Sequence, residues 1–209
     1  MEQTFDHPPH HPLLERYARK KEKELLKPLR KEFSILLGVS ALESITSLIE
    51  ERPECNLLVF GVGNDSGLWL ATNRHRGRTV FLEDHEEWMN KVGANNPGAD
   101  IRLVRYGTQL REWKSLLNSS ENLMLELDED ILATDWDIIL VDGPAGSRSK
   151  EPGRMKSIFS ARQLAKPGAN VYINDCNRRP EKAFADKCFG DTTLAESSGR
   201  FKSFRRYTV

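Results

Sequence analysis

Short apolar runs that alternate with helical or polar stretches dominate the chain after Arg52-Pro53. A run that is apolar at successive positions is typical of a strand buried on both faces of a sheet. Repeated alternation of strand and helix favours a mainly parallel sheet covered by helices on both faces. The predicted fold class is therefore α/β. The predicted strands are Asn56–Phe60, Thr79–Leu82, Asp100–Tyr106, Trp136–Val141 and Asn170–Ile173.

The last stretch, "DTTLAESSGRFKSFRRYTV", has a different rhythm. It contains two strand-like segments around a Ser-Ser-Gly turn at Ser197, Ser198 and Gly199. Two strands joined by such a short connection pair in antiparallel fashion. The sheet is therefore expected to end in an antiparallel hairpin, which an ordinary dinucleotide-binding sheet does not have.

The first quarter of the chain is organised differently. Residues 1–12 contain three histidines and three prolines; such a segment could hold a metal but is more typical of a flexible polar tail. Residues 13–52 carry a helical pattern that Pro28 interrupts, and Ser40 with Glu43 suggests a capped second helix. We expect this helical segment to form one globular unit with the domain at residues 53–209.

The overall composition narrows the class of protein. Thirty-one basic and thirty-one acidic residues cancel, so the net charge predicts no attraction to nucleic acid. Three widely spaced cysteines suit reduced thiols better than a disulfide framework. The sequence has no apolar run near the roughly 20 residues that a bilayer span requires. The chain as given is expected to be soluble.

The loop after the first strand is the candidate ligand site. Gly61 and Gly63 have no side chains, which lets a ligand approach the backbone closely. Ser66 stands where a dinucleotide motif has its third glycine, which weakens a dinucleotide interpretation, and a tight turn without a ligand remains open. Glu83 ends the second strand at the interval expected of an acid that accepts ribose hydroxyls.

Polar residues also follow the fourth and fifth strands. Asp142 ends the fourth, and Asp175 and Asn177 follow the fifth. In a parallel sheet these ends share one edge, and carboxylate and amide oxygens suit Mg²⁺ or Mn²⁺. Turn and helix-capping roles are the alternative for these residues. His85 is a candidate base or a helix cap, and Trp88 is predicted to belong to the core.

Five motifs resemble the plant polysaccharide-biosynthesis family that includes glucuronoxylan 4-O-methyltransferase. They are "CNLLVFGVGNDSGLW", "RTVFLEDHEEW", "DWDIILVDGPAG", "EPGRM" and "NDCNR", and they extend from about Cys55 to Arg179. The resemblance implies a Rossmann-like, class I S-adenosylmethionine-dependent methyltransferase sheet of seven strands that ends in an antiparallel hairpin. Asn64 stands where the family is expected to have His, and "IND" stands where "HD" is expected.

The resemblance also implies roles for particular residues. Asp142 and Asp175 would face the acceptor, as a direct base or through a divalent cation (Mg, Mn or Co) held with Asn177. The guanidinium groups of Arg148, Arg154 and Arg178 would bind the carboxylate of a uronic acid. The implied contacts with S-adenosylmethionine are Gly61, Gly63, Asn64, Asp65 and Ser66 for methionine, Glu83 for ribose, and Tyr106 and Thr108 for adenine.

The function that follows is O-methylation of a sugar hydroxyl, the 4-hydroxyl of glucuronic acid in a glycan. The departures at Asn64 and Asn174 keep another small hydroxylated acceptor open. A non-catalytic scaffold of polysaccharide assembly is the third hypothesis. The compartment would be the cytoplasm for a microbial protein and the Golgi lumen for a plant-type one, and the oligomeric state stays open.

Overall fold

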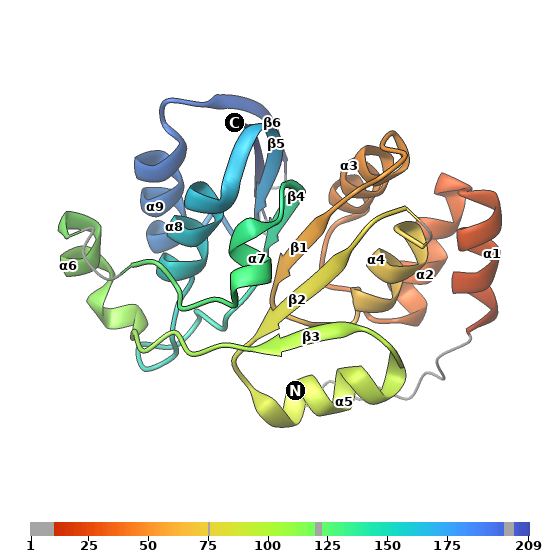
Figure 1. Cartoon of the computed structure of the whole chain (residues 1–209), viewed down its shortest axis with the longest axis horizontal. Helices are drawn as coiled ribbons and strands as arrows, with labels where there is room; N and C mark the ends of the chain where they lie inside the picture. Colours follow the sequence, from red (N-terminus) through yellow and green to blue (C-terminus); the bar gives the residue numbers. More distant parts are fainter. Residues whose placement is uncertain (1–10, 75, 120–122, 199–202) are drawn as a thin grey trace.

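A computed structural model describes residues 11–74, 76–119, 123–198 and 203–209 (Figure 1). Within these residues the strands form one seven-stranded sheet in the order β3-β2-β1-β4-β5-β7-β6. The first five strands are parallel to one another, and β7 pairs antiparallel with both β5 and β6. The predicted parallel sheet with a terminal antiparallel hairpin is confirmed. The strands are β1 (Leu57–Phe60), β2 (Thr79–Glu83), β3 (Asp100–Leu103), β4 (Trp136–Val141), β5 (Ala165–Ile173), β6 (Thr193–Ser198) and β7 (Phe204–Thr208).

Two strands differ by more than one residue from their predicted bounds, whereas β1 and β2 differ by one residue and β4 by none. The strand β3 ends at Leu103 rather than Tyr106, because its single neighbour β2 ends at Glu83, the partner of Leu103. An edge strand has nothing to pair with beyond the end of its neighbour. The strand β5 begins earlier than predicted, at Ala165, and its pairing with β4 is irregular near that end. At the hairpin, Ser197 and Ser198 still belong to β6, and Gly199 lies outside the described residues.

Helices cover both faces of the sheet, and Figure 1 places α1 to α4 on one side and α8 and α9 on the other. The α-helices are α1 (Pro12–Lys20), α2 (Leu26–Glu32), α3 (Val39–Glu50), α4 (Ser66–Thr72), α5 (Glu86–Asn95), α6 (Trp113–Asn118), α7 (Glu129–Ala133), α8 (Met155–Leu164) and α9 (Arg179–Phe189), with short 3₁₀ helices at Lys23–Leu25 and Leu110–Glu112. None of the helices within the described ranges is long and apolar enough to cross a bilayer.

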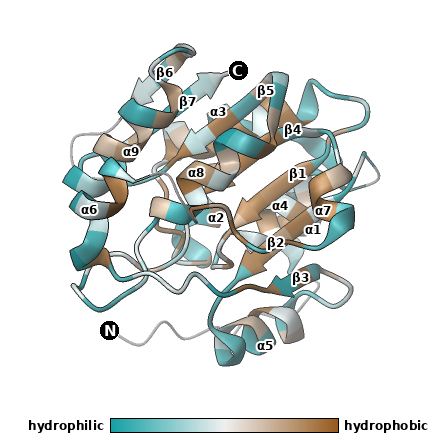
Figure 2. Cartoon of the chain, turned by 60° about the vertical axis from the view of Figure 1, so that its left-hand side comes forward, coloured by the Kyte–Doolittle hydropathy of each residue, from teal (hydrophilic) through white to brown (hydrophobic). Residues whose placement is uncertain are grey.

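The core has two layers because successive side chains of a strand point to opposite faces. On β1, Leu57 and Val59 pack with the N-terminal helices, whereas Leu58 and Phe60 pack with α8 and α9. All four side chains are buried. Figure 2 shows the central strands β1 and β2 as mostly apolar, while α5 and α6 at the periphery mix polar and apolar positions.

The N-terminal helices correct two details of the sequence interpretation. The helix α3 begins after Gly38, so Ser40 is not its N-cap. Pro28 lies in the first turn of α2, where proline is tolerated, and does not end a helix there. The predicted tail cannot be compared in full, since residues 1–10 lie outside the described ranges and α1 already begins at Pro12.

Candidate functional site

Residues that are far apart in the sequence meet at the carboxyl ends of the parallel strands. Gly63 follows β1, Glu83 ends β2, Asp142 follows β4 and Asp175 follows β5. Because β1 pairs in parallel with β2 and β4, and β4 pairs in parallel with β5, these ends share one edge of the sheet. The structure thus places the candidate residues together, as expected of an open α/β sheet.

Two adjoining pockets open at this edge. The first has a volume of about 350 Å³ and the second about 500 Å³, each within the usual range for small-molecule sites of roughly 300–1,000 Å³. Both pockets are lined by Val62, Trp88, Asp142 and Arg154. The first also has Leu36, Gly63, Asn64, Asp65, Asn174, Asp175 and Arg178, and the second has Gly61, Glu83, Asp84, His85, Gly143, Pro144, Ala145, Glu151 and Pro152.

The glycine loop after β1 is packed closely against the loop after β4. Gly61 has a φ of 101°, which favours glycine, and a Cβ atom there would lie 3.0 Å from the backbone of Gly143. The loop is braced from within, since the backbone N–H of Gly63 donates to Ser66 Oγ at 3.0 Å. Ser66 is buried and does not line either pocket. In this structure its hydroxyl braces the loop.

The Glu83 carboxylate is held by three backbone donors. Its Oε2 accepts from the N–H of Val62 at 3.0 Å, and its Oε1 accepts from Asp84 and His85 at 3.1 and 2.9 Å. Burial raises the pKa of Glu83, and the three N–H groups oppose that rise. An ionised carboxylate offers about four acceptor sites. In this arrangement one of them, on Oε2, is left for a further donor.

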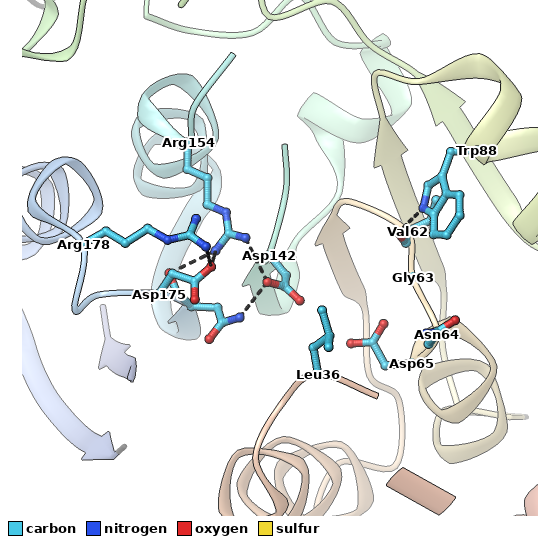
Figure 3. Close-up of a pocket in the computed structure, with 11 residues that line it drawn as sticks. Leu36, Val62, Gly63, Asn64, Asp65, Trp88, Asp142, Arg154, Asp175 and Arg178 are labelled. Atoms are coloured by element: carbon cyan, nitrogen blue, oxygen red, sulfur yellow. Dashed lines mark hydrogen bonds and ion pairs between the residues drawn. The ribbon is translucent and has the colours of Figure 1, made fainter. Parts of the chain in front are cut away.

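Arg154 lies between the two acids that follow β4 and β5 (Figure 3). Its guanidinium contacts Asp142 Oδ1 through Nη2 and Asp175 Oδ2 through Nη1, each at 3.1 Å. Nη1 also donates to the carbonyl of Asn174 at 3.1 Å. The Arg154 residue is 6% exposed. This arginine is therefore committed to organising the two carboxylates.

Arg178 is the more accessible of the two arginines at the first pocket. Its side chain is 35% exposed, against 7% for that of Arg154, and its Nη2 lies 3.0 Å from Asp175 Oδ2. Arg148, also predicted to bind a carboxylate, is exposed and lines neither pocket. Of the three predicted arginines, Arg178 alone combines a place at the first pocket with substantial exposure.

The environment of Asp65 differs from that of Asp142. Figure 3 shows the two carboxylates on opposite sides of the same space, pointing toward one another. The Nδ2 of Asn174 donates to Asp142 Oδ1 at 2.7 Å, in addition to the contact from Arg154. Burial, together with the charge of Asp142, raises the pKa of Asp65 to about 7.

The predicted metal ligands do not fit a divalent cation. Asn177 is exposed and does not line either pocket. Asp142 and Asp175 already share the guanidinium of Arg154, which supplies the positive charge between them. Across the described residues, no three His, Cys, Asp or Glu side chains come together as a metal-binding group. We therefore derive no step of a reaction through a metal.

Other predicted residues lie away from the pockets or at their margin. Tyr106 is 2% exposed and lines neither pocket, and Thr108 Oγ1 donates to the carbonyl of Pro152 at 3.0 Å. The early end of β3 explains this, since the chain has left the sheet before Tyr106. His85 is the N-cap of α5, with its Nδ1 accepting from the N–H of Trp88, and it borders the second pocket.

Trp88 and Leu36 are among the pocket residues that the sequence interpretation did not assign to a site. Trp88 is half-buried rather than part of the core, lines both pockets, and donates from Nε1 to the carbonyl of Val62 at 2.8 Å. Its place in the first turn of a helix that follows Glu83 is a signal that could have indicated it. Leu36 comes from the connection between α2 and α3, and nothing local in its sequence points to the pocket.

A seven-stranded α/β sheet with a terminal antiparallel hairpin and pockets at the carboxyl ends of β1, β2 and β4 defines a methyltransferase fold of class I. The sequence profile of the IRX15/IRX15L/GXM family matches residues 40–126 and 122–204, and the chain belongs to this family.

Characterised relatives lie in Arabidopsis thaliana. Arabinogalactan O-methyltransferase 1 is 35% identical over 76% of this chain and 63% of its own length, and glucuronoxylan 4-O-methyltransferase 2 is 32% identical over 75% and 61%. The chain thus spans less than two thirds of these relatives. A fibrillarin from Aeropyrum pernix solved with S-adenosyl-L-methionine is 11% identical, covers 79% of this chain and 74% of its own, and has a TM-score of 0.49.

Proposed function

We propose that this protein is an S-adenosylmethionine-dependent O-methyltransferase that acts on a sugar hydroxyl in a glycan bearing uronic acid. The observation that carries the proposal is the pair of adjoining pockets: Glu83 lines one, Arg178 lines the other, and Asp142 lines both. The names of the relatives, an arabinogalactan and a glucuronoxylan O-methyltransferase, support the same class of reaction.

The second pocket suits the methyl donor. S-adenosylmethionine supplies a methyl group that is already activated on a sulfonium. Gly61 lines this pocket, and its missing side chain lets the loop after β4 pack against it. The remaining acceptor site of Glu83 matches a ribose hydroxyl. Trp88 stands where the two pockets meet, with its ring orientation fixed by the bond to Val62.

The first pocket suits the acceptor. A sugar hydroxyl is a weak acid, so its proton has to be accepted as the new bond to carbon forms. Asp142 is the base that we propose, because Arg154 and Asn174 fix the orientation of its carboxylate at the junction of the pockets. Asp175 is held by two arginines and orients them. His85 borders the second pocket and is the alternative base.

Arg178 is the group that we propose to bind the acceptor's carboxylate. Arginine offers two parallel donors that match a carboxylate. Arg178 also contacts acids, with its Nη2 at Asp175 and its Nη1 3.6 Å from Glu181 Oε1, but its side chain is 35% exposed and leaves room for such a ligand. The side chain of Arg154 is 7% exposed and contacts both Asp142 and Asp175. The predicted substrate role of Arg154 thus changes to a positioning role in this proposal.

A methyl-transfer assay with S-adenosylmethionine tests the function. We expect turnover with oligosaccharides that carry glucuronic acid and little or none when the carboxylate is reduced to an alcohol. Turnover with arabinogalactan fragments or other hydroxylated molecules alone would support the alternative acceptor. Absence of any heat on titration with S-adenosylmethionine, together with no thermal shift, would instead favour the non-catalytic scaffold.

Glu83→Gln should weaken donor binding about 10- to 100-fold, since a hydrogen bond to a charged group contributes about 1.5–3 kcal/mol. Glutamine has nearly the same shape but lacks the charge. Its amide N–H₂ group would face backbone N–H groups that now donate to the carboxylate, so that two hydrogen-bond donors would oppose one another. Calorimetric titration with S-adenosylmethionine measures the change. Glu87→Gln, at an exposed position of α5, is the matched control; equal donor affinity in both variants would remove Glu83 from the site.

A further inference from the structure

We propose that Leu36 forms an apolar wall against which the sugar ring of the acceptor packs. This inference rests on the proposed function and adds a residue that determines acceptor specificity. Leu36 lines the first pocket from the connection between α2 and α3, residues 33–38. The N-terminal helical segment therefore contributes a lining residue to the first pocket.

The connection buries its other apolar side chains and leaves Leu36 outside. Ile35 and Leu37 are 4% and 2% exposed, whereas Leu36 is 53% exposed. A single exposed leucine on a surface needs no explanation. Leu36 differs because its side chain lines a pocket whose other lining residues are largely polar.

Hydrogen bonds hold the connection in place without involving the leucine side chain. Arg30 Nε donates to the carbonyl of Leu37 at 2.6 Å, and the N–H of Ile35 donates to the carbonyl of Arg30 at 2.9 Å. On the pocket side, Asn64 Nδ2 donates to the carbonyl of Ser34 at 3.2 Å. Asn64 belongs to the glycine loop, so this bond sets the position of the connection relative to the site.

The chemistry of the surrounding groups matches a charged sugar. Figure 3 shows Leu36 beside the carboxylates of Asp65 and Asp142, with Arg178 farther along the same pocket. A pyranose ring has a face rich in C–H groups and an edge of hydroxyls. Leu36 offers apolar surface to that face, Asp142 accepts from a hydroxyl, and Arg178 takes the carboxylate. Leu36 does not line the second pocket, which we assign to the donor.

Leu36→Ala tests the inference in the whole chain. We expect the KM for a glucuronic-acid oligosaccharide to rise about 5- to 10-fold, because the variant loses the apolar area that the sugar ring would cover. The dissociation constant of S-adenosylmethionine and the melting temperature should stay at the wild-type values, since the side chain is exposed. Leu36→Met, which keeps the apolar volume, should restore the KM.

Leu132→Ala is the matched control. Leu132 is a 47% exposed leucine on α7 that lines neither pocket, and its variant should show the wild-type KM. An unchanged KM in Leu36→Ala would overturn the inference, and so would a loss of donor affinity that accompanies the rise in KM.

A second measurement separates this inference from the proposed function. The same oligosaccharide is titrated into protein saturated with S-adenosylhomocysteine, so that binding is read without turnover. Wild-type protein that binds but does not turn over would contradict the proposed function and still give a value for Leu36→Ala, where about 5- to 10-fold weaker binding is expected. Equal binding by both, or no binding by either, would overturn the role of Leu36.

Discussion

Arg154→Met should lower the free energy of unfolding by about 3–5 kcal/mol, the usual cost of removing one partner from a buried ion pair. Methionine keeps the apolar stem and removes the charge. Asp142 and Asp175 would then lose the guanidinium that now contacts both carboxylates at 3.1 Å, and their negative charges would no longer be compensated by it. For a chain of this size the loss corresponds to a fall in melting temperature of roughly 10 °C. Thermal and denaturant unfolding measure it.

The same variant should have no measurable methyl transfer, because the orientation of the proposed base depends on Arg154. Arg154→Lys retains a charge but lacks the planar guanidinium that contacts both acids. Its stability and its rate of methyl transfer should therefore lie between those of wild type and Arg154→Met. Arg148→Met is the control, since Arg148 is exposed and lines neither pocket, and it should match wild type in stability. A fully stable Arg154→Met would contradict the buried ion-pair arrangement.

The sheet and its edge could be predicted because their signals are local. The strand β4 begins and ends at the predicted residues, since a run in which Asp137 is the single polar residue lies between Asp135 and Asp142 and leaves little choice of bounds. Parallel pairing then brings Gly63, Glu83 and Asp142 to the same edge without any further information. In a parallel α/β sheet, the site residues at strand ends can therefore be predicted from the sequence.

The remaining parts of the site depend on tertiary geometry. Asp175 adopts a left-handed conformation with φ of 59°, in a turn that leaves Asn174 at the pocket and Asn177 outside it. The pairing of Arg154 with both acids brings together side chains from three separate segments. Leu36 reaches the pocket from a connection that precedes β1 by about 20 residues. The spacing of residues along the sequence does not predict these contacts.

Asp65→Asn should make the protein more stable at pH 8 and leave its stability nearly unchanged at pH 4. The pKa of Asp65 is about 7 in the folded chain, against an ordinary value of 3.8. A raised pKa means that the folded state holds a proton which the unfolded state releases, so stability falls as the pH rises from about 4 to 7. The slope is about 1.4 kcal/mol per pH unit, which gives a gain of about 4 kcal/mol at most for the neutral asparagine at pH 8.

Melting temperatures of wild type and Asp65→Asn across this pH range measure the effect. Asp142→Asn is the informative companion, because it removes the neighbouring charge that contributes to the raised pKa of Asp65 and leaves burial in place. It should therefore retain part of the pH dependence, while Asp65→Asn should lose most of it. An equal stability difference between wild type and Asp65→Asn at pH 4 and pH 8 would mean that Asp65 has the same pKa in the folded and unfolded states. The two carboxylates that face one another across the first pocket would then not repel appreciably.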